Sequence, residues 1–309
     1  MPRNSCSLTT AAKKTAERRC IKLAAAAYLR SFEDECPAVL NDKSPEALHR
    51  MRVASRRLRV ALGMLSNLET NTSLKRYAKY LRAAGQALGV VREKDVQAAF
   101  LCASVRGTAG KEARAGMAAL ALLLRNQRAA ARERAIHTLK DLKHRDITNK
   151  LRKRLSSLTP ADRVTGKRQD AGALLGEFVT GMLARMPDPI DPNDSEGLHR
   201  LRIAVKKLRY SLEILAPCYG KTLAAATRAA LGMHDVLGDL HEMDVWLEFL
   251  SGKRVTEVGD IAAAASLLNA RCAALRGEAF RKFLRLWNSQ KKRNLWKDLL
   301  RTVCAKPRC

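Results

Sequence analysis

The sequence predicts an all-α protein, for three reasons: its composition, the lack of strand patterns and the helical spacing of its apolar residues. The chain has 309 residues, of which 47% are hydrophobic and only 5% aromatic. Alanine, leucine, arginine and lysine dominate the composition, and all four favour helices. No run of alternating β-branched residues indicates a strand. At this length the chain can form one large domain or two of ordinary size.

The first half is expected to form long helices separated by short breaks. The first helix stops before Pro37, because proline disrupts a helix interior. Ser44 is the expected N-cap of the next helix, with Pro45 at its first position. The polar turn 69–73 and the glycine-containing segment 107–110 separate the following helices. The helices predicted for this half cover residues 9–35, 45–68, 74–105 and 111–158.

The second half is expected to repeat this order after a polar segment. Residues 156–170 have no apolar period and are predicted to form a linker. A short helix and a proline-rich connector follow. Asp194 or Ser195 then caps a helix that ends near Pro217 and Gly220. The helices predicted here cover 171–185 and 195–215, then one ending near 250 and further ones to the C-terminus.

Two segments occur twice, in the same order, along the chain. "LHRMRVASRRLR" (48–59) resembles "LHRLRIAVKKLR" (198–209), which starts 150 positions later. "LGVVREKDVQAAFL" (88–101) resembles "LGDLHEMDVWLEFL" (237–250), at an offset of 149. Matching order and nearly equal offsets predict an internal duplication of a roughly four-helix unit. The predicted organisation is a first bundle over 9–158, a linker over 156–170 and a second bundle over 171–303.

Each copy of the first repeat places a row of basic residues on one face of its helix. At about 100° per residue, the members of a row fall within roughly 80° of arc. The rows are His49, Arg52, Arg56 and Arg59 in the first copy, and His199, Arg202, Lys206 and Arg209 in the second. Arg57 and Lys207 lie at the flank of the rows. An apolar seam for packing lies on another face, formed in the first copy by Leu48, Met51, Leu58, Leu62 and Leu65.

Neither row contains an acidic residue. Like charges on one helix face repel each other by several tenths of a kcal/mol per neighbouring pair. The rows therefore require an external anion or acidic residues from another helix; a solvated face that keeps the protein soluble is the alternative. The histidine that begins each row can donate a hydrogen bond to a phosphate oxygen, although a structural role is the alternative there too.

The charge of the whole chain also favours an anionic partner. It contains 58 Lys and Arg against 30 Asp and Glu, a formal net charge of +28. Nucleic acid, anionic lipid and phosphate polymers are candidates, and a generally basic proteome is the alternative explanation. Eight cysteines without a C-x-x-C pair give little support to a zinc site and suit reduced thiols. Without a signal-like N-terminus or a membrane-spanning stretch, the expected location is the cytoplasm.

At the repeated histidine segment the sequence resembles the CHAD family, the conserved histidine α-helical domain. The family pattern, approximately H-x-x-R-[VI]-x-x-[RK]-[RK]-L-R, is matched at 49–59 and again at 199–209. A third-helix pattern is partly matched in the first half, at Arg82, Leu88, Gly89, Arg92, Asp95 and Val96, with Glu93 in place of an aspartate. In the second half, Leu231 replaces a basic residue, with Arg228 one turn earlier, and His241 replaces an arginine.

The resemblance covers roughly residues 9–303 and has consequences for fold and function. It implies two four-helix bundles related by pseudo-twofold symmetry, whose basic helices face a shared central cavity. It also implies non-catalytic binding of inorganic polyphosphate, in the cytoplasm and in some members at polyphosphate granules. The E-x-E-x-K motif of the CYTH domain that is fused to some members is absent, so the chain looks like a stand-alone CHAD protein.

The function predicted on these grounds is polyphosphate binding through the basic rows. The candidate residues are His49, Arg52, Arg56, Arg57, Arg59, Arg82, Arg92, His199, Arg202, Lys206, Lys207 and Arg209, with Lys79, Arg228 and His241 as secondary candidates. Neither a cofactor nor a metal is predicted, and no membrane partner. The main alternative is non-specific nucleic-acid binding, although single-strand binders usually add aromatic stacking platforms, which the rows lack.

A second alternative is a metal-binding accessory to a phosphate-related enzyme. In the segment 234–244, "HDVLGDLHEMD", the carboxylates Asp235, Asp239 and Glu242 share a helix face, and His234 aligns with His241. Oxygen ligands of this kind can hold a divalent ion, whereas ion pairing with the arginines is the simpler explanation. No nucleophile elbow or P-loop is found, so the chain is not predicted to be an enzyme.

Overall fold

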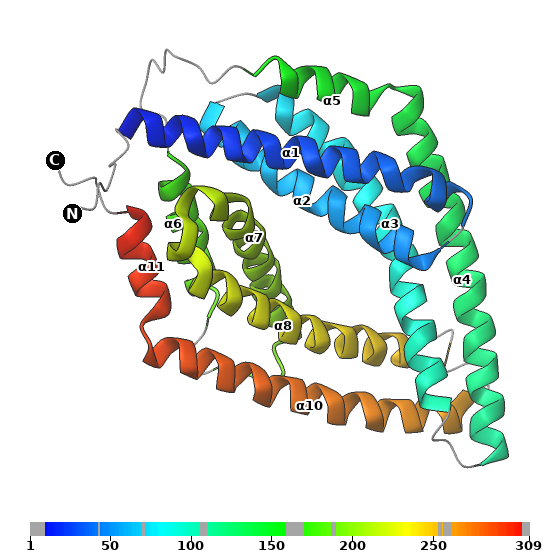
Figure 1. Ribbon diagram of the computed structural model, residues 1–309. Helices are drawn as coiled ribbons and strands as arrows, with labels where there is room; N and C mark the ends of the chain where they lie inside the picture. Colours follow the sequence, from blue (N-terminus) through cyan, green and yellow to red (C-terminus); the bar gives the residue numbers. More distant parts are fainter. Residues whose placement is uncertain are drawn as a thin grey trace.

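The computed structural model describes residues 10–42, 44–69, 72–105, 110–158, 170–186, 190–252, 255 and 261–304. Over these residues the protein consists of helices joined by turns, with no strand (Figure 1), which confirms the all-α prediction. None of the helices in this described part is long and apolar enough to cross a membrane.

The first half forms α1 (Thr10–Leu40), α2 (Pro45–Glu69), α3 (Thr72–Val105), α4 (Lys111–His144) and α5 (Ile147–Ser156). The start of α2 is as predicted, because the backbone N–H of Glu46 donates to Ser44 Oγ at 3.1 Å. The predicted end of the first helix was wrong, since α1 continues through Pro37. A proline in the last turn removes few helical hydrogen bonds, and Val39 beyond it packs into the core with 6% exposure.

The long helix predicted over 111–158 is broken. Asp146 adopts the left-handed conformation, with φ of 54°, and separates α4 from α5. Aspartate tolerates this conformation better than most residues. The turn allows Ile147, Leu151 and Leu155 of α5 to be buried in the main core. Packing of one apolar face therefore decides where α4 ends.

The second half forms α6 (Ala171–Leu183), α7 (Ser195–Tyr219), the 3-10 helix η1 (Gly220–Leu223), α8 (Ala224–Ser251), α10 (Ala262–Lys292) and α11 (Leu295–Cys304). The predicted capping by Asp194 is confirmed, because Gly197 N–H donates to its Oδ1 at 2.7 Å. The helix runs a few residues past the predicted 215, since α7 includes Pro217 and ends at Tyr219, with Gly220 at its end as predicted. Most of the predicted linker, residues 159–169, lies outside the described residues.

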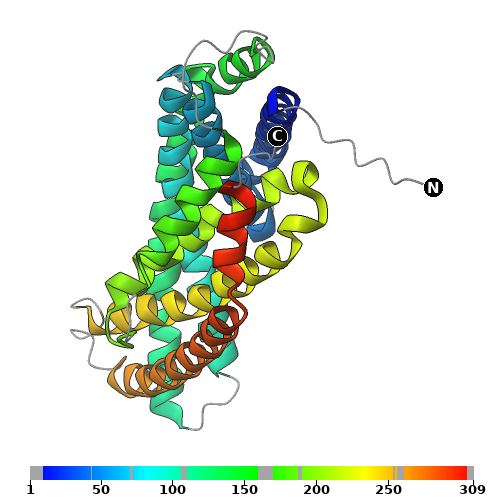
Figure 2. The same ribbon diagram turned by 90° about the vertical axis from the view of Figure 1, so that its left-hand side faces the viewer.

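The two basic helices, α2 and α7, bury their apolar faces and contact each other. In Figure 1 and Figure 2, α2 lies between α1 and α3, and α7 lies beside α8. The predicted seam Leu48, Met51, Leu58, Leu62 and Leu65 is buried, with exposures of 5% or less. One hydrophobic cluster contains both this seam and residues of α7. The apolar faces of α2 and α7 therefore hold the two helices together in a shared core.

A second hydrophobic cluster joins the helices at the far end of the molecule. There α4 and α10 meet (Figure 1), and Leu120 of α4 packs in the same cluster as Leu268 of α10. Leu101 of α3 and the fully buried Trp246 of α8 complete the contact. This cluster fixes where α3 and α8 cross, and with them the two copies of the second sequence repeat.

A disulfide joins Cys20 of α1 to Cys218 of α7. This differs from the expectation of reduced thiols, because spacing along the chain carries no information about which cysteines meet in space. Among the other described cysteines, Cys36, Cys102 and Cys272 are free. The disulfide links the first half of the chain to the second, beside the packing of α1 against α7.

Candidate functional site

The basic rows of α2 and α7 face each other. Arg56 Nη1 of α2 lies 3.5 Å from the hydroxyl oxygen of Tyr210 of α7. The charges of Arg52 and Arg56 act directly on Arg202 and Lys206 across the interface. The rows are therefore brought together rather than turned to separate solvent-exposed faces. We refer to Arg52, Arg56, Arg59, Arg202 and Lys206, all half-buried, as the central cation cluster.

No carboxylate of the described residues neutralises the central cation cluster. The ion pairs among the described residues involve other cations, such as Arg57 and Arg92, and none of the cluster. Within the cluster, the Nε atoms of Arg59 and Arg202 are buried and lack a hydrogen-bond partner. Buried N–H groups without a partner are costly and uncommon in folded proteins. The cluster is therefore a group of half-buried positive charges with no counter-ion among the described residues.

Burial and mutual repulsion lower the pKa values of these cations. Burial, followed by the charges of Arg56 and Arg202, lowers the pKa of Lys206 to about 7. Burial and the same kind of repulsion also lower the pKa of Arg52, although an arginine stays protonated in proteins. An anion placed between the helices would reverse both effects for Lys206, because an opposite charge favours its protonated form.

Three of the predicted residues are engaged elsewhere. Arg57 and Arg209 share one carboxylate, Glu213, at 3.1 and 2.9 Å. Arg57 also stacks near the rings of Tyr28 and Tyr210. The side chain of Lys207 points away from the cluster, with Nζ 3.9 Å from the ring centroid of Phe178. The sequence reasoning overlooked Glu213, although it stands four positions after Arg209, where helical side chains meet.

The histidines that begin the rows are neutral neighbours of the cluster. Burial is the main cause that lowers the pKa of both His49 and His199, and nearby arginines add to it. His199 Nδ1 lies 3.2 Å from His241 Nδ1, so one imidazole donates to the other. Burial lowers the pKa of His241 to about 4. His49 Nδ1, in contrast, is buried and has no hydrogen-bond partner in the part of the chain that the structure describes.

The predicted cations of α3, Arg82 and Arg92, differ in their position relative to the basic row of α2. Arg92 acts on His49 and Arg52 from α3, although Glu46 stands 4.0 Å away. Arg82 is exposed but close enough to lower the pKa of Arg59. The secondary candidates Lys79 and Arg228 are exposed, and no described contact brings either to the cluster.

Gly89 explains how α3 approaches the basic row of α2. A Cβ atom at Gly89 would lie 3.4 Å from Arg52 Nε, at the short limit of ordinary van der Waals contact. At Gly238, the corresponding residue of the second repeat, nothing lies within 4 Å of such an atom. The glycine of the leucine–glycine pair thus lies against an arginine of the basic row in the first half, whereas Gly238 has no such neighbour within 4 Å.

Two arginines outside the motifs hold the basic helices in place. Arg128 of α4 bridges Asp95 of α3, at 2.6 Å, and Asp42 just before α2, at 3.0 Å. Arg276 of α10 bridges Asp244 of α8, at 2.6 Å, and the hydroxyl of Ser195 at the start of α7, at 3.1 Å. The arginines follow the repeated aspartates by 33 and 32 positions. This shared spacing is a signal that could have identified them.

The acidic segment of α8 is largely occupied by such ion pairs. Besides Asp244, Asp235 lies 3.2 Å from His234 and 3.6 Å from Arg209. Within the described part of the chain, no group of three or more histidine, cysteine or acidic side chains could hold a metal ion. Asp239 and Glu242 line a separate cavity of about 640 Å³ between α8 and α10, and burial raises the pKa of each.

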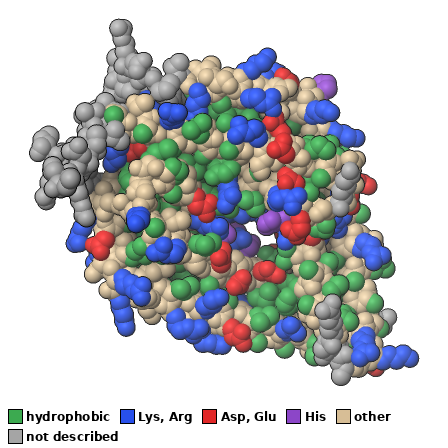
Figure 3. Space-filling model, in the orientation of Figure 1, with side chains coloured by type: hydrophobic (Ala, Val, Ile, Leu, Met, Phe, Trp, Pro, Cys, Tyr) green, Lys and Arg blue, Asp and Glu red, His purple; other side chains and the backbone are tan. Residues whose placement is uncertain are grey.

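Charged side chains are also unevenly arranged on the surface of the molecule. Figure 3 shows a hollow near the centre of one face, with histidine, basic and acidic side chains gathered around it. Basic side chains are spread over the rest of the same face. Positive charge is therefore widely spread over this face, whereas the half-buried cations of the central cation cluster lie between α2 and α7.

Comparison with known proteins identifies relatives of this arrangement. The sequence model of the CHAD domain matches residues 23–251, well over half of the chain. No curated protein sequence matches it. The CHAD domain from the plant Ricinus communis has a similar structure, with a TM-score of 0.60 and 22% identity, over 94% of this chain and 92% of that one. PptA from Streptomyces chartreusis also has a similar fold, with a TM-score of 0.62 and 17% identity, over 88% of this chain and 99% of that one.

Proposed function

The chain belongs to the CHAD domain family, and from that premise we propose that it binds inorganic polyphosphate between α2 and α7. The observation that carries the proposal is the central cation cluster, in which Arg52 and Arg56 face Arg202 and Lys206 and no carboxylate of the described chain pairs with them. A flexible anionic chain would relieve the repulsion among these residues.

Polyphosphate suits the chemistry of the cluster. The polymer carries roughly one negative charge per repeat and no bases, so its recognition requires regularly spaced cations. Cations one helical turn apart are separated by about 5 Å along the axis. Arginine can hold a phosphate with two parallel N–H donors, and the buried Nε atoms of Arg59 and Arg202 are donors without an acceptor.

Nucleic acid is a weaker candidate for this site. Proteins that bind single strands usually stack bases on exposed aromatic rings. The aromatic residue nearest the rows, Tyr210, is only 3% exposed and lies against the guanidinium of Arg57. Its ring is therefore not a stacking platform. Phosphate contacts alone would give binding that does not distinguish DNA from polyphosphate of equal charge.

Competition binding tests the proposal. Labelled polyphosphate is bound at about 150 mM salt, where screening shortens the range of surface electrostatics to about 8 Å. We expect unlabelled polyphosphate to displace it at concentrations well below those required for single- or double-stranded DNA of equal charge. Displacement by DNA at equal or lower concentration would contradict the proposal.

We further propose that the protein binds polyphosphate without catalysis and is located in the cytoplasm. Following the resemblance to the CHAD family, we also propose that it associates with polyphosphate granules. Incubation with long polyphosphate should leave its length unchanged on a gel. A fluorescent fusion should co-localise with polyphosphate stain, and a fusion of the variant Arg52→Glu/Arg56→Glu should lose that co-localisation. The division into bundles over 9–158 and 171–303 likewise stays a prediction.

A further inference from the structure

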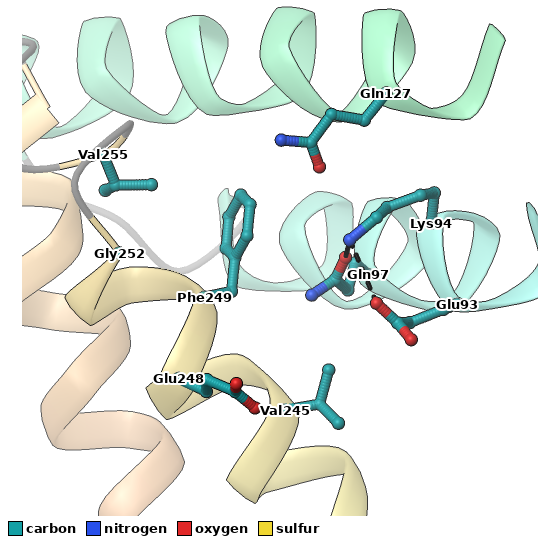
Figure 4. Close-up of a pocket in the computed structure, with 9 residues that line it drawn as sticks. All are labelled: Glu93, Lys94, Gln97, Gln127, Val245, Glu248, Phe249, Gly252 and Val255. Carbon is teal, nitrogen blue, oxygen red and sulfur yellow. Dashed lines mark hydrogen bonds and ion pairs between the residues drawn. The ribbon is translucent and has the colours of Figure 1, made fainter. Parts of the chain in front are cut away.

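A cavity distinct from the one between α8 and α10 lies where α3 and α8 cross, at the two copies of the second sequence repeat. It has a volume of about 400 Å³ and is lined from α3, α4 and α8 (Figure 4). None of the residues lining it belongs to the central cation cluster. Its walls combine a buried amide, a half-buried ammonium group, an aromatic ring and apolar side chains.

The buried amide belongs to Gln97, which is 1% exposed. The ammonium group of Lys94 donates to Gln97 Oε1 at 2.8 Å and to Glu93 Oε1 at 3.0 Å. Because an ammonium group only donates, this contact fixes the orientation of the amide. Gln97 Nε2 therefore points away from Lys94 and towards Phe249, as Figure 4 shows. It is buried and has no hydrogen-bond partner among the described residues.

An unpaired buried donor in the wall of a cavity indicates a ligand that supplies an acceptor. Buried N–H groups are almost always satisfied in folded proteins. The cavity is too large to be explained by one water molecule, which requires only one probe sphere of space. A ring carbonyl or ring nitrogen of a ligand would complete the hydrogen bonding of Gln97.

The other walls favour a flat ligand. The ring of Phe249 forms one side, and Lys94 Nζ lies 5.3 Å from its centroid. Val245 and Val255 add apolar surface. The amide of Gln127, from α4, extends into the space between the helices (Figure 4), where it offers both a donor and an acceptor. A planar heterocycle can stack on the ring while its polar edge meets the two amides.

The charges around the opening of this cavity disfavour a ligand that carries a phosphate group. Glu93 and Glu248 are both exposed at the rim, so the formal charges of these two residues and Lys94 sum to −1. Carboxylates repel phosphate but accept hydrogen bonds from sugar hydroxyl groups. We propose that this cavity binds an uncharged nucleoside, with the base held by Gln97, Gln127 and Phe249 and the sugar at the rim.

The second repeat provides an internal comparison. At the offset of 149, Gln97 corresponds to the fully buried Trp246, and Lys94 corresponds to Met243. Phe249 corresponds to Phe100, which lines the 640 Å³ cavity beside α10. That cavity has an aromatic wall but no amide. It should therefore not bind nucleosides, and Phe100→Leu serves as the matched control for Phe249→Leu.

Ligand-observed NMR and calorimetry with uridine, cytidine, adenosine and inosine, and with ribose alone as control, test the proposal at about 150 mM salt. At least one nucleoside should show saturable binding, and its 5′-monophosphate should bind no tighter. Gln97→Glu keeps the size of the side chain and the contact with Lys94 but removes the donor, so affinity should fall about tenfold. Phe249→Leu should reduce affinity, and Phe100→Leu should leave it within about twofold.

Three results would overturn the inference: no saturable binding of any nucleoside, undiminished binding by Gln97→Glu, or displacement of the nucleoside by saturating polyphosphate. If Gln97→Glu fails to fold, as judged by its melting curve, the Phe249→Leu and Phe100→Leu pair decides the question. Polyphosphate affinity should be unchanged in these variants, so the failure of this inference is distinguishable from failure of the proposed function.

Discussion

The two basic helices carry the same motif but differ in what surrounds it. On α2, Arg52, Arg56 and Arg59 form no ion pair with a described carboxylate, and Arg92 of α3 adds a further cation. On α7, the last cation of the row, Arg209, is held by Glu213. Residues of the same type at the same helical position therefore do not have the same capacity to bind an anion.

The supporting helices show the same inequality. In the first half, α3 approaches α2 closely through Gly89 and brings Arg92 to the row. In the second half, His241 stands where the family pattern has an arginine, and it pairs with His199 as a neutral group. We infer that α2 and α3 supply most of the affinity for the polymer and that α7 supplies the opposite wall.

The largest expected effect comes from reversing the charges of one row. Arg52→Glu/Arg56→Glu should weaken polyphosphate binding on the order of a hundredfold, because truncated buried charge contacts cost several kcal/mol. Arg202→Glu/Lys206→Glu should weaken it by about tenfold, since Lys206 is only partly protonated near pH 7. Calorimetry measures both affinities, and circular dichroism should show unchanged helicity.

Lys292→Glu/Lys297→Glu is the matched control for these variants, because it changes the net charge equally at exposed positions. It should reduce affinity by only a few-fold through long-range electrostatics. Equal losses of polyphosphate affinity in the two row variants would contradict the inference that α2 and α3 supply most of the affinity. A loss in the control as large as in the row variants would show that overall charge, rather than the cluster, binds the polymer.

The pH dependence of binding separates Lys206 from the arginines. Its pKa of about 7 in the free protein means that the charged form dominates below pH 7 and is lost above it. Polyphosphate favours the charged form, so affinity should fall from pH 6 to pH 8, by at most about tenfold per pH unit. Lys206→Arg should remove this decline, because arginine stays protonated; a decline that persists in that variant would exclude Lys206 as its source.

The same group has the opposite effect on the stability of the free protein. The ordinary pKa of a lysine, 10.5, is lowered in the folded state, so the unfolded chain binds more protons between about pH 7 and 10.5. Stability should therefore rise with pH in that window. Thermal melts without polyphosphate should show a smaller rise for Lys206→Arg than for the unmodified protein.

The angular arrangement of each basic row could be predicted from sequence, because helical periodicity fixes which residues share a face. The burial of Met51 and Leu58, and the capping by Ser44 and Asp194, are confirmed for the same reason: they depend on local spacing. The family resemblance added the expectation that the rows face each other, which periodicity within one helix does not contain.

Features that depend on the packing of distant segments could not be read from local patterns. The turn at Asp146 follows from burial of the apolar face of α5, and the disulfide between Cys20 and Cys218 follows from contact between α1 and α7. The sharing of Glu213 by Arg57 and Arg209 depends on the rotation of α2 against α7. Sequence spacing specifies none of these rotations.

The two glycines of the repeated leucine–glycine pair offer a sharper comparison. Gly89→Ala places a methyl group 3.4 Å from Arg52 Nε, at the short limit of ordinary contact, so it should restrict the guanidinium and lower affinity by at most about threefold. Gly238→Ala meets nothing within 4 Å and should leave affinity unchanged. Alanine favours a helix over glycine by about 0.5–1 kcal/mol, so melting should show Gly238→Ala stabilised. Equal affinities for the two variants would mean that the approach of α3 does not position Arg52.

The smallest expected effect restores a cation that the second half lacks. Leu231 stands at the position of Arg82 in the sequence repeat, and it is 38% exposed on α8. Leu231→Arg should therefore fold normally and raise affinity about two- to threefold, as one partly screened phosphate contact would. Leu267→Arg adds the same charge at a leucine of α10 that is 48% exposed, and it should have a smaller effect. An equal gain in polyphosphate affinity for both variants would mean that the position on α8 is irrelevant. A gain specific to Leu231→Arg would show that the second half of the chain has the geometry to bind the polymer but lacks cations.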